Sequence, residues 1–169
     1  MPAILIREIN SQDIDIYKSF FIKALINDEE SFRITPQDDA NAPFPTSDKE
    51  DSFTLGAFDE NRLIGVVSFA REGMNREKLR HKGLLFRMVV SETYRGLGIA
   101  KNLIYEVIGR VQNIPDIEQI NLTVISNNAN ATGLYKRFGF VAFGAEENAI
   151  KWKNKYLTED QMVLKLRGR

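Results

Sequence analysis

The sequence of 169 residues contains no cysteine and only one histidine, and these two absences exclude several kinds of chemistry. Without cysteine the chain has no disulfide, no thiolate nucleophile and no thiolate-bound metal. A single histidine, His81, provides no cluster of imidazoles, so we expect no bound metal. Since the sequence also lacks the pattern of a signal peptide and a membrane-spanning run, the cytoplasm is the expected location.

The sequence also has no excess of charge of one sign and no long apolar run. Lysine and arginine together number 23, as do aspartate and glutamate, so we expect neither nucleic acid nor a membrane surface as a partner. No apolar stretch approaches the roughly 20 residues that span a bilayer, and "MPAILIREIN" lacks the pattern of a signal peptide. The length and the 43% hydrophobic content are typical of one globular domain, which we place over residues 1–169.

Alternation and helical spacing predict a mixed α/β (α+β) fold. Apolar residues at Ile14, Tyr17, Phe21 and Leu25 repeat on one helical face after a cap at Asn10 or Ser11. We interpret "RITPQDDANAPFPTSDKEDS" as a loop with a short helix near 47–50, and the charged segment 147–159 as a connection between strands. The elements expected elsewhere are strands over 3–8, 53–59, 62–72, 84–90, 119–126, 140–146 and 160–166, and helices over 99–111 and 129–139.

This order predicts a mostly antiparallel seven-stranded sheet flanked by helices. The run "LLFRMVV" (84–90) is nearly all apolar, as in a strand covered on both faces. The segment 84–126 has the strand–helix–strand order of a parallel crossover, and we expect it at the centre of the sheet.

A glycine-rich turn, Arg95 to Lys101, lies between the strand and the helix of this crossover. The first amides of a helix have no intrahelical acceptor and lie at its positive end, while glycine lets an anion approach the backbone. Two familiar phosphate loops do not fit. The P-loop requires a hydroxyl where Asn102 stands, and the dinucleotide pattern requires a third glycine where Lys101 stands.

Two motifs carry a resemblance to a known family. Arg95-Gly96-Leu97-Gly98-Ile99-Ala100 fits the pattern Q/R-x-x-G-x-G/A, and the segment 128–140 fits N-x-x-A-x-x-L-Y-x-x-x-G-F at every fixed position. In this order and at this spacing they resemble the GCN5-related N-acetyltransferase (GNAT) superfamily. The resemblance is firm over residues 84–140, and it implies a sheet whose fourth and fifth strands splay apart.

The resemblance implies transfer of an acetyl group from acetyl-CoA to a primary amine, by direct attack in a ternary complex that releases coenzyme A. It places the pyrophosphate on the glycine turn and the pantetheine arm along the fourth strand. A backbone amide of a bulge near Val89 or Val90 would polarise the thioester, and Tyr135 would act as general acid towards the leaving thiolate. The residues implied to bind acetyl-CoA are Met88, Val89, Val90, Arg95, Gly96, Leu97, Gly98, Ile99, Ala100, Lys101, Asn128, Ala131 and Tyr135.

The acceptor and its base stay open at the level of the sequence. Glu72, His81, Glu146, Glu147 or a chain of waters could take the proton from the amine. The acceptor is a small molecule or a protein, with Phe20, Phe21 and Phe44 as candidates for the pocket wall. Acidic residues at 38, 39, 48, 50 and 51 could attract an amine.

A second function with the same fold is a non-catalytic acyl-CoA-binding regulator. Asn128 and Tyr135 favour the enzyme, because a sensor needs no general acid. The resemblance also implies contacts between two copies of the chain through the last two strands.

Overall fold

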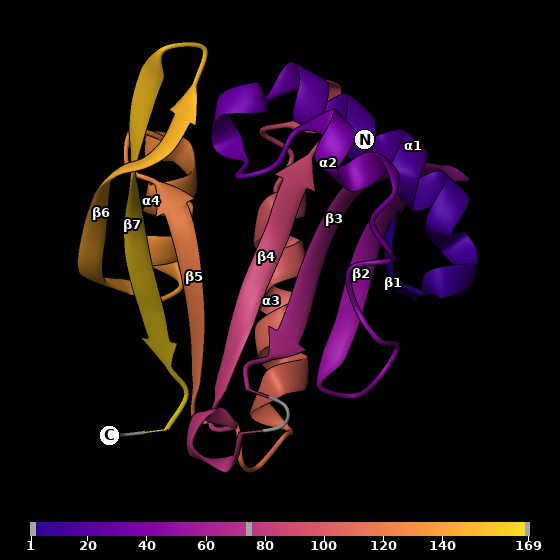
Figure 1. Cartoon of the computed structure of the whole chain (residues 1–169). Helices are drawn as coiled ribbons and strands as arrows, with labels where there is room; N and C mark the ends of the chain where they lie inside the picture. The colour runs from indigo at the N-terminus through magenta and orange to yellow at the C-terminus, as the bar shows by residue number, and fades with distance from the viewer. Residues whose placement is uncertain (1–2, 74–75, 168–169) are drawn as a thin grey trace.

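The computed structural model of the chain describes residues 3–73 and 76–167. Its seven strands form one sheet in the order β1-β2-β3-β4-β5-β7-β6 (Figure 1). Only β4 and β5 pair in parallel, and every other neighbouring pair is antiparallel. The predicted mixed sheet with a central parallel crossover is therefore confirmed. The strands are β1 (Ile4–Ile9), β2 (Ser52–Asp59), β3 (Arg62–Arg71), β4 (Lys82–Val90), β5 (Gln119–Ile125), β6 (Val141–Trp152) and β7 (Lys155–Lys165).

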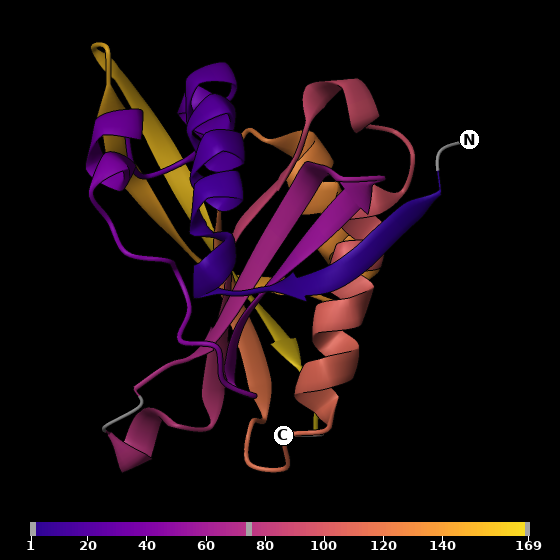
Figure 2. The same cartoon turned by 90° about the vertical axis from the view of Figure 1, so that its right-hand side faces the viewer.

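The helices cover the sheet from both sides. α1 (Ile14–Asn27) lies on one face and α3 (Ile99–Gln112) on the other, as Figure 2 shows. On the α1 side, Tyr17 and Phe21 form a small core with Phe44 and with residues of β1 to β4. On the α3 side, a larger core also includes Tyr135 of α4 (Ala129–Arg137). The described helices include none that is both long and apolar enough to cross a membrane.

The central strands separate along their length. The parallel pairing of β4 with β5 covers only Lys82 to Leu84 on the β4 side, opposite Gln119 to Asn121. From Leu85 onward the edge of β4 that faces β5 has no strand beside it, and the two strands diverge towards the end of β4 (Figure 1). We call this divergence the splay. Its closed end is at Lys82, and its open end lies where β4 reaches the glycine turn.

One predicted short helix is in the wrong place. The structure has no helix at 47–50 and instead forms α2 over Pro36–Ala40. Thr35 caps α2, because its hydroxyl accepts from the Asp38 amide and the Asp38 carboxylate accepts from the Thr35 amide. Thr-Pro-x-Asp is a capping box with proline at the first helical position, and this signal was present in the sequence.

The predicted connection at 147–159 is also wrong, because most of it is strand. β6 and β7 continue to Trp152 and Lys155, and Lys153 and Asn154 alone make the turn. Both turn residues have positive φ (50° and 62°), as a tight two-residue hairpin turn requires. Apart from the buried Glu159, the charged residues of this segment lie on exposed strand faces or in the turn, and their high charge concealed the alternation of Ile150 and Trp152.

Candidate active site

The glycine turn is built as an open anion site. Gly96 and Gly98 both have φ of 80°, a conformation that other residues adopt only with strain. A Cβ atom on either glycine would meet no atom within 4 Å, so the space over the turn is free. The requirement for glycine here therefore comes from the backbone conformation and leaves the amides accessible.

The first amides of α3 are free to bind a ligand. The helical hydrogen bonds begin with the Asn102 amide, which donates to the Gly98 carbonyl at 3.0 Å, and no side chain caps the helix. Within the described residues, the N–H groups of Ile99, Ala100 and Lys101 have no acceptor. Three unpaired donors at the positive end of a 14-residue helix favour an anionic ligand.

Arg95 has a partner that the sequence did not predict. Its Nε donates to the Val90 carbonyl at 3.2 Å, and its Nη2 forms an ion pair with Asp28, just beyond the end of α1. The guanidinium therefore lies between the end of β4 and the end of α1. Because the side chain is still about half exposed, it remains accessible to a phosphate.

The predicted bulge in β4 is present, but it lies earlier in the strand than we expected. Val89 pairs with Val66 and Phe86 with Ser68, so Arg87 and Met88 together face one residue of β3. Arg87 has φ of 51°. The amides at the bulge are thus those of Arg87 and Met88, whereas Val90 lies beyond it, paired with Gly65.

The far side of the splay is formed by the second motif. Asn128 caps α4, because its Oδ1 accepts from the Ala131 amide at 3.2 Å. Its amide nitrogen has no partner in the described part of the chain, and Ala131 is half-buried beside the larger core. The predicted contact of Asn128 with pantetheine therefore has to come from this nitrogen or from the backbone.

Tyr135 lies in the larger core, with its ring edge-on to Phe140 at a centroid distance of 5.7 Å. Burial raises the pKa of its phenol well above the ordinary value. No described residue is hydrogen-bonded to the hydroxyl, and the hydroxyl oxygen is not completely buried. A neutral phenol with a free hydroxyl can donate to a developing anion.

Two of the predicted bases lie at the wrong end of the sheet. Glu72 follows β3 and its carboxylate is 3.7 Å from Lys82 at the closed end of the splay. The His81 carbonyl accepts from the Glu118 amide at the same end. Along a strand, His81 is about 25 Å from Val89. Neither side chain is placed to deprotonate an amine at the open end.

Three ion pairs connect the segment after α1 with the β6–β7 hairpin. Arg33 binds Glu159 of β7 through two nitrogens, and the Glu159 side chain is only 4% exposed. The other two pairs are Glu29 with Lys153 at 3.0 Å and Glu30 with Lys155 at 3.2 Å. We call the segment 29–33, together with these three ion pairs, the strap. It joins the α1 side of the molecule to the strands beyond the splay.

The burial of Glu159 could not be predicted from the sequence, because an acidic residue within a charged segment is usually exposed. Most of the acids that we expected to attract an amine have other partners. Asp38 caps α2, Asp39 is buried in ion pairs, Asp48 accepts from Ser11, and Asp51 binds Arg71. The residues predicted for an aromatic pocket wall are mostly core, because Phe21 and Phe44 are buried.

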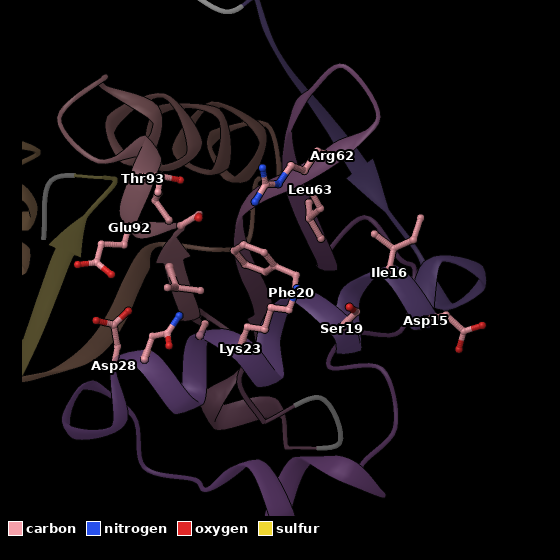
Figure 3. A pocket seen from close by; sticks show the side chains of 15 residues that line it. Asp15, Ile16, Ser19, Phe20, Lys23, Asp28, Arg62, Leu63, Glu92 and Thr93 are labelled. Carbon is pink, nitrogen blue, oxygen red and sulfur yellow. The ribbon is translucent and has the colours of Figure 1, made fainter.

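A cavity of about 580 Å³ lies between α1 and the ends of β3 and β4 (Figure 3). Phe20, Leu63 and Val89 give it an apolar lining, while Lys23, Asp28, Arg62 and Glu92 supply charges. Its volume is in the range of small-molecule sites. Of the residues predicted to bind acetyl-CoA, only Val89 and Val90 line it, so it lies on the α1 side of β4 and away from α4.

Comparison with known proteins agrees with this geometry. The sequence pattern of the Acetyltransferase (GNAT) family matches residues 15–140, about three quarters of the chain. The chain belongs to the GNAT family. It is 30% identical over 120 residues to the uncharacterized N-acetyltransferase YhbS of Escherichia coli, covering 69% of this chain and 67% of that protein. It is 29% identical over 90 residues to the spermine/spermidine N(1)-acetyltransferase of Bacillus subtilis, covering 51% of this chain and 57% of the relative.

Solved structures share the fold over almost the whole chain. A GNAT acetyltransferase from Streptococcus pneumoniae has a TM-score of 0.81 at 22% identity, covering 96% of this chain and 99% of its own. Arabidopsis thaliana NAA60, solved in complex with acetyl-CoA, has a TM-score of 0.75 at 24% identity, covering 98% of this chain and 100% of its own. As a GNAT enzyme, this protein is an acetyl-CoA-dependent N-acetyltransferase, and its amine acceptor is not identified.

Proposed function

We propose that this GNAT enzyme binds acetyl-CoA, as donor substrate, in the splay and passes the acetyl group directly to an amine bound beside it. One observation carries the proposal: the unpaired edge of β4 leads straight into a turn with three free amides, Ile99 to Lys101. The amides of an extended pantetheine arm can hydrogen-bond to the unpaired edge of β4, and a pyrophosphate can accept hydrogen bonds from the free amides of the turn.

Met88, Val89 and Val90 would hold the pantetheine arm through their backbone, while Asn128 and Ala131 contact it from the α4 side. Arg95, Gly96, Leu97, Gly98, Ile99, Ala100 and Lys101 would bind the pyrophosphate. The bulge amides lie where the thioester oxygen gains negative charge, and stabilising such charge is a large contribution to catalysis. This set of residues is inferred from the motifs and supported by the positions described above.

Tyr135 is our candidate for the general acid. Its pKa is raised by burial, so the phenol stays protonated throughout the neutral range and never repels a departing thiolate. Because a raised pKa also makes it a weaker acid, we expect it to transfer its proton only as the carbon–sulfur bond breaks and charge builds on the sulfur.

Direct transfer is supported by composition. An acyl-enzyme on a thiolate is impossible in a chain without cysteine. We therefore expect a ternary complex, with the amine attacking the thioester carbon, the carbon–sulfur bond breaking, and coenzyme A leaving as the thiol.

The experiment follows free thiol while both substrates are varied, with polyamines, amino acids, aminoglycosides and short peptides as acceptors. Intersecting double-reciprocal lines with one class of amine support the proposal, and parallel lines contradict direct transfer. Tyr135→Phe should lower turnover with unchanged affinity for acetyl-CoA. Binding of acetyl-CoA without thiol release for any acceptor would instead favour a regulator.

Three finer expectations stay predictions. We expect one domain over 1–169, a cytoplasmic location, and a homodimer formed through the last strands. Exposed Val141 and Phe143 on the edge strand β6, and Tyr156 on β7, support the dimer. Light scattering of the purified protein tests it.

A further inference from the structure

Arg87 occupies the bulge of β4 in an unusual way. It adopts φ of 51°, the left-handed region that favours glycine, at the point where two residues of β4 face one of β3. Glycine would take this conformation without strain. An arginine in this strained conformation indicates that its side chain has a specific role.

That side chain is fixed on the α1 side of the sheet. Arg87 Nη1 donates to Asp39 Oδ1 at 2.9 Å and to the Tyr17 hydroxyl at 3.1 Å. Its guanidinium carbon lies 4.9 Å from the centroid of the Phe21 ring. One side chain therefore connects the bulge to both helices on this side, α1 and α2.

Burying the carboxylate of Asp39 costs desolvation energy, so a role in stability alone would not explain it. It is 0% exposed, and it is held by two cations, Arg87 and Lys18. Lys18 Nζ lies 3.1 Å from Asp39 Oδ2, without the geometry of a hydrogen bond. Burying charges requires their removal from water, so such a network is a poor source of stability compared with apolar packing.

We propose that Arg87 is a positioning residue, and that its anchor on Asp39 orients the bulge amides towards the thioester oxygen of bound acetyl-CoA. This inference rests on the proposed function of the splay. It also joins the donor site to α2, because a displacement of α2 moves Asp39 and with it the side chain that holds the bulge.

The test compares two ligands that differ in the thioester alone. Acetyl-CoA has a carbonyl oxygen for the bulge amide, and coenzyme A has none, so the ratio of their affinities reports on this hydrogen bond. Calorimetric titration would be carried out on the wild type, Asp39→Asn, Arg87→Met and Arg87→Gly. The glycine variant adopts the positive φ without strain, so it remains informative if the methionine variant does not fold.

The matched control is Asp116→Asn. Asp116, whose side chain is 61% exposed, binds the buried Arg71 at the closed end of the splay. The control removes one carboxylate partner of an arginine far from the bulge, while Asp51 still pairs with Arg71, and it leaves the bulge untouched.

We expect Asp39→Asn, Arg87→Met and Arg87→Gly to weaken acetyl-CoA about threefold to tenfold more than coenzyme A, as for the loss of one hydrogen bond. Asp116→Asn should leave the ratio unchanged. If the wild type binds both ligands but the first three variants weaken both equally or neither, the inference is wrong and the network is structural. If the wild type binds neither ligand, the proposed function fails and this inference fails with it.

Discussion

The same substitution at two glycines of one helix should have opposite effects. Gly98 precedes α3 at φ of 80°, whereas Gly109 lies inside α3 without positive φ, and a Cβ on either would meet no atom within 4 Å. Steric overlap is therefore absent at both sites. Gly109→Ala should stabilise the protein by about 1 kcal/mol, because alanine loses less entropy in a helix.

Gly98→Ala should destabilise it by about 1 to 2 kcal/mol, the cost of a left-handed alanine. For a chain of this size, each kcal/mol corresponds to about 2 to 4 °C in Tm. The assay is urea unfolding of both variants followed by titration with acetyl-CoA. Gly98→Ala should also bind acetyl-CoA more weakly, because an alanine relaxes out of the positive φ and turns the free amides of α3 away from the ligand. Gly109→Ala should bind acetyl-CoA normally.

Two results would refute this reasoning. A stabilising Gly98→Ala would show that the turn does not require positive φ. An unchanged affinity for acetyl-CoA in a clearly destabilised Gly98→Ala would show that the amides of this turn do not hold the ligand.

Three other changes test separate parts of the account. Burial raises the pKa of Tyr17 to about 12, so the unfolded chain ionises first and stability falls by about 2 kcal/mol between pH 10 and pH 12. Tyr17→Phe should remove this share of the alkaline loss in unfolding curves, and an identical loss would contradict it. Arg33→Met leaves the buried Glu159 carboxylate unpaired and should lower the free energy of unfolding by about 1 to 3 kcal/mol, whereas Lys153→Met, in an exposed pair of the strap, should change it little. Equal effects in thermal melts would show that burial of Glu159 is unimportant. Tyr135→Phe should lower kcat by about a hundredfold or more, with the Kd of acetyl-CoA unchanged; normal turnover would remove Tyr135 from the mechanism.

The sequence predicted those parts of the fold that depend on local periodicity. The seven strands, the central crossover and the long helix after Gly98 follow from apolar spacing and glycine position, and Gly139 ends α4 with φ of 98°. The failures have local causes as well. The Thr35–Asp38 capping box was hidden among prolines, and the charges of segment 147–159 masked two strands joined by a two-residue turn.

The site was only half predictable. The glycine turn joins β4 to α3 and Asn128 caps α4, which are features of local backbone geometry that a motif encodes, while their binding roles stay predictions. The partnerships of Arg87 with Asp39 and of Arg33 with Glu159 join residues 48 and 126 positions apart, and no local pattern encodes such distances. One signal was available: a charged residue inside the apolar run "LLFRMVV" indicates a side chain with a specific partner.

The central claim is that acetyl-CoA occupies the splay and the glycine turn. Hydrogen exchange of the wild type with and without acetyl-CoA tests it most directly, because the claim names the amides that become covered. We expect slower exchange at 88–90, at 96–101 and at 128–135, with little change at 15–28. Slower exchange confined to α1 and the residues around Arg62, which line the cavity of Figure 3, would place the ligand elsewhere and contradict the account.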